Sequence, residues 1–324
     1  MYTFDQLQDL FNTSFDLSEI PLKPYRLYDP IRYSLSQGGK RMRPLLVLMA
    51  CDMFEGDLMD AMNSAIAVEV FHNFTLLHDD IMDQSPIRRG VDTVYKKWDT
   101  SVAILSGDTM FALAYDYITR SRPEMLPKIL PLFTQTAREV CEGQQIDMDF
   151  EETEGVSIEE YIEMIRLKTA VLPAACLKLG ALFAGASDND CRLTYSFGQN
   201  IGLAFQIKDD LLDVYGDQDI FGKRTGNDIL TNKKTWLYLR ALEKAEGKDK
   251  EALLHYYSGK HFDIHEKVSE ITGIYDKLGI REEAEALMQE YNDKALEDLD
   301  AISVSDELKL VIRDFALMLN DRNL

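Results

Sequence analysis

The stretch from Val70 to Gly90 reads VFHNFTLLHDDIMDQSPIRRG, and in it an apolar helical run ends in three aspartates and then two arginines. In one helix Asp79 and Asp83 are four residues apart and share a face, while Asp80 lies beside them, about 100° around the axis. Three carboxylates this close repel one another unless a cation lies between them. The stretch therefore predicts a helix whose end binds a cation.

The cation that fits these aspartates best is Mg²⁺, because it prefers oxygen ligands and commonly takes only one or two protein carboxylates beside water and phosphate. Arg88 and Arg89 follow at once, and guanidinium groups bind phosphate through paired hydrogen bonds. Metal and arginine together predict a diphosphate ligand. A solvated helix end with charges of both signs is the alternative, since acidic helix surfaces are common.

A second stretch, Phe205 to Asp217, reads FQIKDDLLDVYGD and repeats the pattern with Asp209, Asp210 and Asp213. Repetition makes coincidence the weaker explanation. The two clusters are about 130 residues apart in the sequence. If they serve one ligand, they must face each other across a cavity, with metal ions bridging them to a shared anion.

Length and composition favour a single domain over residues 1–324, because 46% of the residues are hydrophobic and no linker or low-complexity tract interrupts them. Runs of alternating β-branched residues are almost absent, which predicts an all-α fold. The formal net charge of −21 argues against a nucleic-acid partner. No apolar run approaches the ~20 residues that cross a bilayer, and the N-terminus does not resemble a signal peptide. We therefore expect a cytoplasmic protein with no membrane span.

A basic turn precedes the first acidic helix. The segment SLSQGGKRMRP, residues 34–44, combines two glycines with Lys40, Arg41 and Arg43, and Pro44 opens the next helix. Anions favour a glycine turn that leads into a helix N-terminus. The segment is either an anion site or only a basic turn.

The helix predicted from about Leu58 to His78 carries three residues below the aspartates. His72 lies seven residues before Asp79 and either contacts a phosphate or is an ordinary core histidine. Thr75 and Phe74 are predicted to line the pocket beneath the metal site.

Polar residues also interrupt the later apolar helices. Lys168 and Thr169 lie within EMIRLKTAVLPAACLKLGALFAG, and a lysine there rarely stays buried without an anionic partner. Pro173 is predicted to kink that helix one turn beyond Lys168. Gln206 lies one turn before Asp210.

The segment DQDIFGKRTGNDILTNKKT, residues 217–235, is predicted to be a long polar loop. Lys223 and Lys233 would close over bound phosphates, as active-site lids do, and a plain surface loop is the alternative. From Trp236 to Leu319 the pattern predicts amphipathic scaffold helices.

Taken together, these motifs resemble the trans-isoprenyl diphosphate synthases, or polyprenyl synthetases. The resemblance runs from about Ser34 to Thr235 in a consistent order: GGKRMRP, LLHDDIMDQSPIRRG, LKTA, FQIKDDLLD, FGKRTGNDI and KKT. It implies a helical bundle around a deep central cavity, the type I isoprenoid synthase fold, usually as a homodimer. It also implies an enzyme that condenses isopentenyl diphosphate with an allylic diphosphate to give a trans-polyprenyl diphosphate and diphosphate.

The resemblance further implies the roles of individual residues. Three Mg²⁺ ions per site would be held on the allylic diphosphate by two aspartate clusters: Asp79, Asp80 and Asp83, and Asp209, Asp210 and Asp213. The same diphosphate would be neutralised by Arg88, Lys168, Lys223 and Lys233. The isopentenyl diphosphate would be held by Lys40, Arg43, His72 and Arg89. Neutral oxygens near the carbocation would come from Thr169 and Gln206.

Product length in this family depends on bulky residues four and five positions before the first aspartate, here Thr75 and Phe74. Phe74 lies ~7.5 Å down the helix axis from Asp79, which predicts C20 or C15 products over C40. The sequence departs from the family at two positions. Lys208 replaces a frequent glutamine and is expected to weaken metal binding by Asp209, and Asn232 replaces a frequent glycine.

Other functions stay open. A noncatalytic regulatory subunit would show damage to one aspartate cluster, and both are intact; a long-chain (C30–C40) synthase is a further alternative. A phosphohydrolase using His78 and Asp79 would need more histidines placed as ligands. A terpene cyclase has no need of a second diphosphate site.

Overall fold

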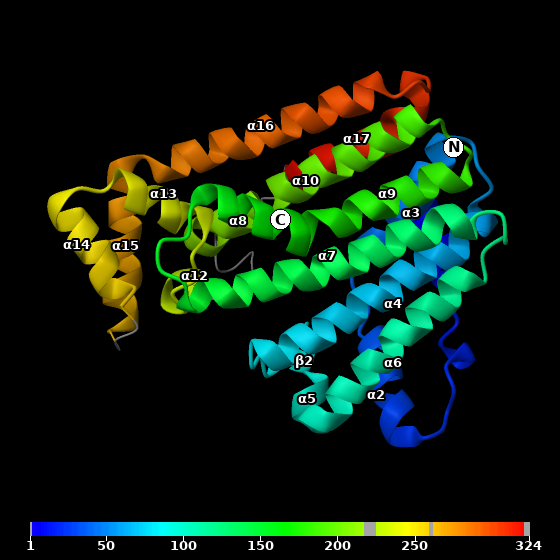
Figure 1. Cartoon of the computed structure of the whole chain (residues 1–324), viewed down its shortest axis with the longest axis horizontal. Helices are drawn as coiled ribbons and strands as arrows, with labels where there is room; N and C mark the ends of the chain where they lie inside the picture. Colours follow the sequence, from blue (N-terminus) through cyan, green and yellow to red (C-terminus); the bar gives the residue numbers. More distant parts are fainter. Residues whose placement is uncertain (1, 217–224, 259–261, 321–324) are drawn as a thin grey trace. The chain divides into compact units, whose positions relative to one another are not determined.

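The computed structural model describes residues 2–216, 225–258 and 262–320, and these residues are helical almost throughout (Figure 1). The chain divides into two compact units. Unit 1 comprises Met1–Thr134, Ala175–Thr194 and Ser303–Ile312, and unit 2 comprises Gln135–Ala174, Tyr195–Ile302 and Arg313–Leu324. The all-α prediction is confirmed. Because each unit is assembled from three stretches, no single boundary divides the sequence, and the single domain stays a prediction.

The elements follow one another along the chain in the order of their labels. Within unit 1 they are α1 (Phe4–Ser14), η1 (Leu17–Glu19), α2 (Tyr25–Ser36), α3 (Met42–Met53), α4 (Leu58–Met82), β1 (Ile87–Arg88), β2 (Val91–Asp92), α5 (Val94–Lys97) and α6 (Thr100–Thr119). Within unit 2 they are α8 (Ile158–Ile165), η2 (Arg166–Ala170), α12 (Asn227–Leu230), α13 (Trp236–Lys244), α14 (Gly247–Tyr256), α15 (Ile264–Leu278) and α16 (Ile280–Ala301). Helices with residues in both units are α7 (Leu126–Glu152), α9 (Val171–Phe183), α10 (Asp188–Tyr215) and α17 (Asp306–Asn320).

Helix α4 is the central helix of unit 1. Asp57 caps its N-terminus by accepting a hydrogen bond from the Met59 N–H at 2.9 Å. Most of its residues up to Phe71 are buried, as expected for a helix that is apolar on nearly every face. Helix α6 lies alongside it (Figure 1). This packing fixes the helix that ends in the first aspartate cluster.

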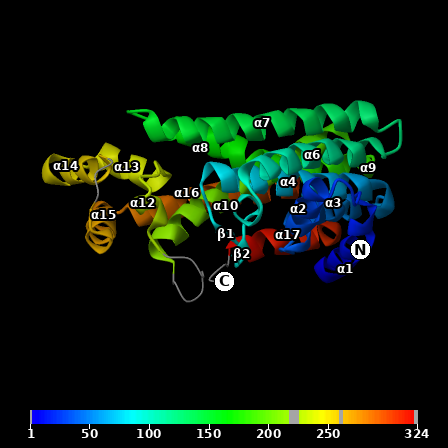
Figure 2. The ribbon, with the colours of Figure 1, turned by 90° about the horizontal axis from the view of Figure 1, so that it is seen from below.

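A short β-hairpin follows α4, and the sequence reading missed it. Ile87 pairs with Asp92 and Arg88 with Val91, and Arg89 and Gly90 form the turn with φ of 52° and 78°. Two consecutive positive φ values are those of a type I′ turn, which suits a two-residue hairpin. Strands of two residues give no alternating pattern, so periodicity could not reveal them. Figure 2 shows the hairpin at the end of α4.

Unit 2 has its own hydrophobic core, built from α8, α13, α15 and α16. Helix α8 begins with a capping box, in which the Ser157 hydroxyl and the Glu160 carboxylate each accept a hydrogen bond from the other's backbone N–H. Buried residues such as Tyr161, Leu237 and Ile271 fill the space between these helices. Figure 2 shows α13, α14 and α15 grouped at one end of this unit.

The helix containing Lys168 has a π-helical turn, η2, in which the Val171 N–H donates to the Arg166 carbonyl. The sequence predicted a kink one turn beyond Lys168, at Pro173, and the irregular turn instead surrounds Lys168. Proline removes the hydrogen bond to the carbonyl four residues earlier, so the disturbance falls on the preceding turn. Pro30 likewise lies inside a helix, α2.

Candidate active site

The first aspartate cluster lies at the C-terminal end of α4. Asp83 caps the helix through a 2.8 Å hydrogen bond from its N–H to the Asp79 carbonyl, and its side chain is exposed. Asp80 is only 5% exposed, and it accepts a 2.7 Å hydrogen bond from Arg88 Nε. Burial raises the pKa of Asp80, and the Arg88 guanidinium opposes the rise. The cluster thus combines an exposed acid with a buried acid that a cation neutralises.

Arg89 joins the hairpin to the basic turn. Its guanidinium donates a hydrogen bond to the Gly38 carbonyl. A Cβ placed on Gly39 would lie 2.8 Å from the guanidinium carbon of Arg89, so only glycine allows this approach. Gly39 and Arg41 both have positive φ, at 123° and 49°. Two motifs predicted from separate stretches therefore meet in unit 1.

Arg43 and His72 are also in contact, since Arg43 Nη1 lies 3.0 Å from His72 Nε2. Burial lowers the pKa of His72 well below its usual value, and Arg43, Arg89, Arg88 and Arg41 lower it further. A neutral His72 accepts a hydrogen bond from Arg43. Arg43 Nε is buried with no hydrogen-bond partner among the described residues. Lys40 is exposed in the same turn. The predicted isopentenyl diphosphate residues thus form one strongly cationic cluster, called here the arginine cluster.

Glu69 stabilises this cluster by pairing with one of its neighbouring arginines, and the sequence pattern was not used to predict it. The carboxylate is 2% exposed, forms an ion pair with Arg41 and accepts a 2.7 Å hydrogen bond from Asn73 Nδ2. A glutamate within the apolar run AVEVF of α4 was a usable signal, because an acid buried there needs a cationic partner.

In unit 2, Lys168 finds the anionic partner that its apolar surroundings required. Its ammonium group forms an ion pair with Asp147 of α7. The backbone of η2 also lies directly against α7. A Cβ placed on Gly143 of α7 would be only 2.3 Å from the backbone nitrogen of Lys168. This close contact fixes the position of the π-helical turn and of Lys168.

A chain of hydrogen bonds links Thr169 to the second aspartate cluster. The Thr169 hydroxyl donates to Gln206 Oε1 at 3.1 Å, and Gln206 Nε2 donates to Asp210 Oδ1 at 3.1 Å. The hydroxyl of the buried Tyr161 donates to the other oxygen of Asp210. Burial raises the pKa of Asp210 to about 7, although both hydrogen bonds oppose the rise. Tyr161 lies 49 residues away in the sequence, so spacing could not predict it.

The other two aspartates of this cluster differ in exposure. Asp209 is exposed, whereas Asp213 is partly buried and accepts a 2.9 Å hydrogen bond from the Asp228 N–H. Burial and then the nearby Asp228 raise the pKa of Asp213 to about 6. Asp228 is a further acid of the site that the sequence reading did not select, although it belongs to the quoted segment FGKRTGNDI.

Lys233 is the cation among these acids. Burial alone would lower its pKa, but four carboxylates outweigh burial and raise the pKa above its ordinary value: Asp228, Asp147, Asp210 and Asp209. A lysine in this position keeps its charge. The other predicted loop cation, Lys223, lies outside the described residues.

Comparison with known proteins decides the family: the family described as Polyprenyl synthetase matches residues 24–275. The chain belongs to the polyprenyl synthetase family. It is 40% identical over 250 residues to a geranylfarnesyl diphosphate synthase of Natronomonas pharaonis, covering 72% of this chain and 73% of the relative. A crystal structure of a geranylgeranyl pyrophosphate synthase superposes with a TM-score of 0.93 at 42% identity, covering 98% of both chains. A geranylgeranyl pyrophosphate synthase from Corynebacterium glutamicum, solved with isoprenyl diphosphate and magnesium, gives a TM-score of 0.84 at 29% identity, covering 99% of this chain and 97% of the other. The predicted family, fold and prenyltransferase activity are confirmed.

The two departures from the polyprenyl synthetase pattern have local explanations. Lys208 does not turn toward the metal cluster: its ammonium donates a 2.9 Å hydrogen bond to the Leu319 carbonyl in α17. The expectation that Lys208 weakens metal binding therefore has no support in its contacts. Asn232 has a φ of 59°, in the region that favours glycine and that asparagine tolerates better than most residues.

The residues predicted to set product length lie on α4 of this polyprenyl synthetase. Phe74 belongs to a group of aromatic rings in unit 1, with its centroid 5.3 Å from Phe111, 4.8 Å from His78 and 5.6 Å from Phe71. The Thr75 hydroxyl donates to the His72 carbonyl at 2.8 Å. Phe74 is therefore held in place by neighbouring rings from two helices.

His78 is occupied by contacts that a phosphohydrolase ligand would not make. Its Nε2 lies 3.2 Å from the Ile104 carbonyl, and its ring packs over Gly107 of α6. These contacts favour a structural role for His78 over a metal-binding pair with Asp79.

The donor set suits a magnesium ion. The described residues include no group of three His, Cys, Asp or Glu side chains arranged as a ready-made metal site. Mg²⁺ does not require one, because it takes one or two carboxylates and completes its shell with phosphate and water. Exposed Asp83 and Asp209 offer hard oxygen ligands, and Asp228 lies beside Asp213, whose carboxylate accepts a hydrogen bond from the Asp228 N–H. Within the described part of the chain, no helix is long and apolar enough to cross a membrane.

Proposed function

We propose that this polyprenyl synthetase condenses isopentenyl diphosphate with an allylic diphosphate and releases geranylgeranyl diphosphate, a C20 product. The observation that carries the proposal is the arginine cluster, in which Arg43 lies 3.0 Å from His72 and Arg89 reaches the Gly38 carbonyl of the basic turn. Cations in such density need an anion with several charges, and a diphosphate supplies one. The geranylgeranyl product follows from the synthase that this chain superposes on at 42% identity.

In the proposed reaction the carbon–oxygen bond of the allylic diphosphate breaks, and the diphosphate leaves with the electron pair. The alkene of isopentenyl diphosphate donates its π electrons to the allylic carbon, a carbon–carbon bond forms, and a proton is lost. Three Mg²⁺ ions per site, held by Asp79, Asp83 and Asp209, would stabilise the leaving diphosphate as Lewis acids. Asp80, Asp210 and Asp213 would complete the two clusters.

The other proposed roles, binding the two diphosphates and stabilising the carbocation, belong to cationic and neutral polar side chains. Arg88, Lys168, Lys223 and Lys233 would bind the allylic diphosphate and neutralise the negative charge that gathers on the leaving group. Arg43, His72, Arg89 and Lys40 would orient isopentenyl diphosphate. The oxygens of Thr169 and Gln206, already hydrogen-bonded to each other, would stabilise the carbocation.

Product sizing tests the proposal. The protein is incubated with Mg²⁺, radiolabelled isopentenyl diphosphate and, in separate reactions, dimethylallyl, geranyl or farnesyl diphosphate. A labelled C20 product is expected with each primer. If no primer is extended, the chain is a noncatalytic subunit; a main product of C30–C40 would make it a long-chain synthase.

Replacing Phe74 by Ala tests the chain-length assignment. Removal of this ring from the group on α4 and α6 should open space for at least one more five-carbon unit, so the main product should lengthen from C20 to C25 or more. Tyr115→Phe is the matched control, because it removes only a hydroxyl that donates to Thr134 and should leave the product unchanged. An unaltered product from Phe74→Ala would place the length-limiting residue elsewhere.

A homodimer and a cytoplasmic location complete the proposal. The homodimer is proposed from the family resemblance and from the usual assembly of such enzymes. Sedimentation equilibrium of the purified protein checks it, and a molecular mass near that of one 37.1 kDa chain would contradict it.

A further inference from the structure

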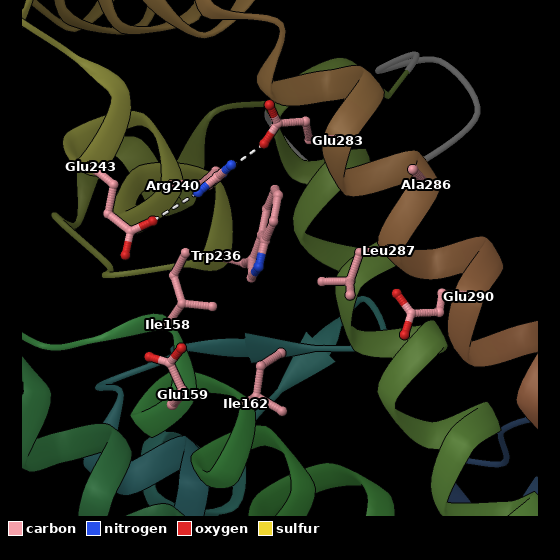
Figure 3. Close-up of a pocket in the computed structure, with 10 residues that line it drawn as sticks. All are labelled: Ile158, Glu159, Ile162, Trp236, Arg240, Glu243, Glu283, Ala286, Leu287 and Glu290. Atoms are coloured by element: carbon pink, nitrogen blue, oxygen red, sulfur yellow. Dashed lines mark hydrogen bonds and ion pairs between the residues drawn. The ribbon is translucent and has the colours of Figure 1, made fainter.

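Unit 2 contains a cavity of about 470 Å³ that none of the predicted active-site residues line. Its walls come from three helices, α8, α13 and α16, and Figure 3 shows their side chains converging on it. The apolar part consists of Ile158, Ile162, Trp236, Ala286 and Leu287. The cavity is wide open to solvent, so a ligand bound in it would stay partly exposed.

Trp236 gives this cavity an unused hydrogen-bond donor. The residue is only 6% exposed, and among the described residues its indole N–H has no acceptor. In Figure 3 the indole stands in the cavity with its nitrogen turned toward the space between Ile162 and Leu287. Because the indole N–H faces the cavity, it is available to a ligand.

The rim of the cavity is acidic. Four glutamates line it against a single cation, Arg240, which is shared by Glu243 at 3.0 Å and Glu283 at 2.6 Å. Glu290 forms an ion pair with Lys294 at 2.6 Å. Glu159 is exposed and has no cationic partner in the described part of the chain. The rim therefore has one carboxylate left for a cation.

We propose that this cavity binds an amphipathic organic cation, an ammonium or guanidinium group on an apolar body. The apolar body would lie against Ile158, Ile162 and Leu287, and the cation would be attracted by Glu159 and by the face of the Trp236 indole. A polar acceptor on the ligand would take the Trp236 N–H. The site is separate from the proposed prenyl transfer and would exist even if that reaction were wrong.

The test uses tryptophan fluorescence. The chain has two tryptophans, and Trp98→Phe leaves Trp236 as the only reporter. The full-length Trp98→Phe protein is titrated with n-hexylammonium chloride, with n-hexanol as the matched neutral probe and with ammonium chloride as the cation without an apolar body. We expect saturable quenching by hexylammonium and binding of hexanol about ten-fold weaker, because an ion pair and a cation–π contact each contribute a factor of about two to five at a partly exposed site.

Variants locate the site. In the Trp98→Phe background, Glu159→Gln should weaken hexylammonium binding about three-fold, and Ala286→Phe, which fills the cavity from an exposed position, should abolish it. Glu251→Gln is the control, since it removes an exposed carboxylate of α14 that does not line the cavity. Equal binding of hexanol and hexylammonium, no fluorescence change, or equal effects of Glu159→Gln and Glu251→Gln would each overturn the proposal.

Titration with a short basic peptide distinguishes two sources of the cation, a protein segment and a free amine. Acetyl-Leu-Lys-Leu-amide carries the same ammonium on a peptide with carbonyl acceptors. Tighter binding of this peptide than of hexylammonium would assign the site to a basic protein segment. Weaker binding would assign it to a free amine.

Discussion

The two aspartate motifs have the same spacing and different surroundings. In unit 1 the carboxylate of the buried Asp80 accepts a hydrogen bond from the guanidinium of Arg88, whose positive charge balances the negative charge of the acid. In unit 2 the buried Asp210 accepts hydrogen bonds from two neutral donors, Tyr161 and Gln206, and the charge of Lys233 also stabilises it. Burial raises the pKa of both acids, and that of Asp210 reaches about 7. The comparison shows that the middle acid of the motif is buried in both copies, while the neighbours of each copy decide how that acid is stabilised.

The exposed acids should behave alike, and replacing them gives the largest expected effect. Asp83→Asn and Asp209→Asn each remove an exposed carboxylate from a proposed metal ligand set. The turnover rate should fall by about 10²-fold or more, because a metal ion contributes several kcal/mol of charge stabilisation. Thermal stability should hardly change, since both side chains are exposed. Steady-state kinetics at increasing Mg²⁺ concentration and a melting curve measure both.

Asp188→Asn is the matched control for this pair, because Asp188 is an exposed acid in the first turn of the same helix as Asp209. It should leave turnover unchanged. If only one of the two cluster variants loses activity, the two motifs do not have equivalent roles.

The two buried acids, Asp80 and Asp210, should differ in how much stability is lost when a hydrogen-bond partner is removed. Arg88→Ala leaves Asp80 buried without its cation, which should lower the free energy of unfolding by about 1–3 kcal/mol at pH 7. Tyr161→Phe should cost about 1 kcal/mol, because Asp210 keeps its hydrogen bond from Gln206. Urea denaturation gives both values.

A second substitution checks the cause of the Arg88 effect. If the loss comes from an unpaired charge on Asp80, Asp80→Asn added to Arg88→Ala should restore part of the stability. If Asp80→Asn lowers the free energy of unfolding of the Arg88→Ala protein by as much as it lowers that of the wild-type protein, the unpaired charge on Asp80 is not the cause of the Arg88 effect. Charge balance would then not explain how Asp80 is stabilised in unit 1.

The arginine cluster should also appear in the pH dependence of stability. His72 has its pKa lowered well below 6.5 in the folded chain, so protons bind to it mainly in the unfolded chain. Its contribution is therefore fully present above about pH 6.5 and is lost as the pH falls, by about 1.4 kcal/mol per pH unit at most. His72→Gln keeps an acceptor for Arg43 without titrating.

Urea denaturation at pH 7.5 and 5.5 tests this contribution. The wild-type protein should lose about 1 kcal/mol more than His72→Gln between the two values. Equal losses would mean that His72 takes up a proton as readily in the folded protein as in the unfolded chain, so that burial and the arginines do not lower its pKa.

The sequence was sufficient to select the candidate site residues, and it failed where a contact joins distant stretches. Spacing alone found both aspartate clusters, and an isolated lysine in an apolar helix identified Lys168. The ion pair of Lys168 with Asp147 and the hydrogen bond from Tyr161 to Asp210 span 21 and 49 residues. No local pattern encodes such pairs, because their partners are chosen by packing between helices.

Backbone geometry was the other part that the sequence did not predict. The hairpin that carries Arg88 and Arg89 has only two residues in each strand, too few for an alternating pattern. Lys208 also depends on backbone geometry, because neighbouring helical residues point about 100° apart, and its effect on metal binding at Asp209 stays a prediction. The Lys208 ammonium reaches the Leu319 carbonyl.

Asn232 gives the smallest expected effect and extends the comparison to a buried cation. Its side-chain oxygen accepts a hydrogen bond from Lys267, which is 4% exposed, so a neutral group stabilises this buried cation. Asn232→Gly relieves a positive φ of 59° but removes that acceptor. The strain is about 1 kcal/mol and the lost acceptor about 1–3 kcal/mol, so the free energy of unfolding should fall by about 1 kcal/mol.

The sign of this effect should reverse when the cation is removed. In a Lys267→Met background the acceptor has no partner to lose, so only the relief of strain remains and Asn232→Gly should stabilise the protein by up to about 1 kcal/mol. Urea denaturation of the four proteins in this cycle measures the change. If Asn232→Gly destabilises both backgrounds equally, the hydrogen bond to Lys267 contributes nothing, and the family's usual glycine at this position is avoided here for a reason other than charge balance.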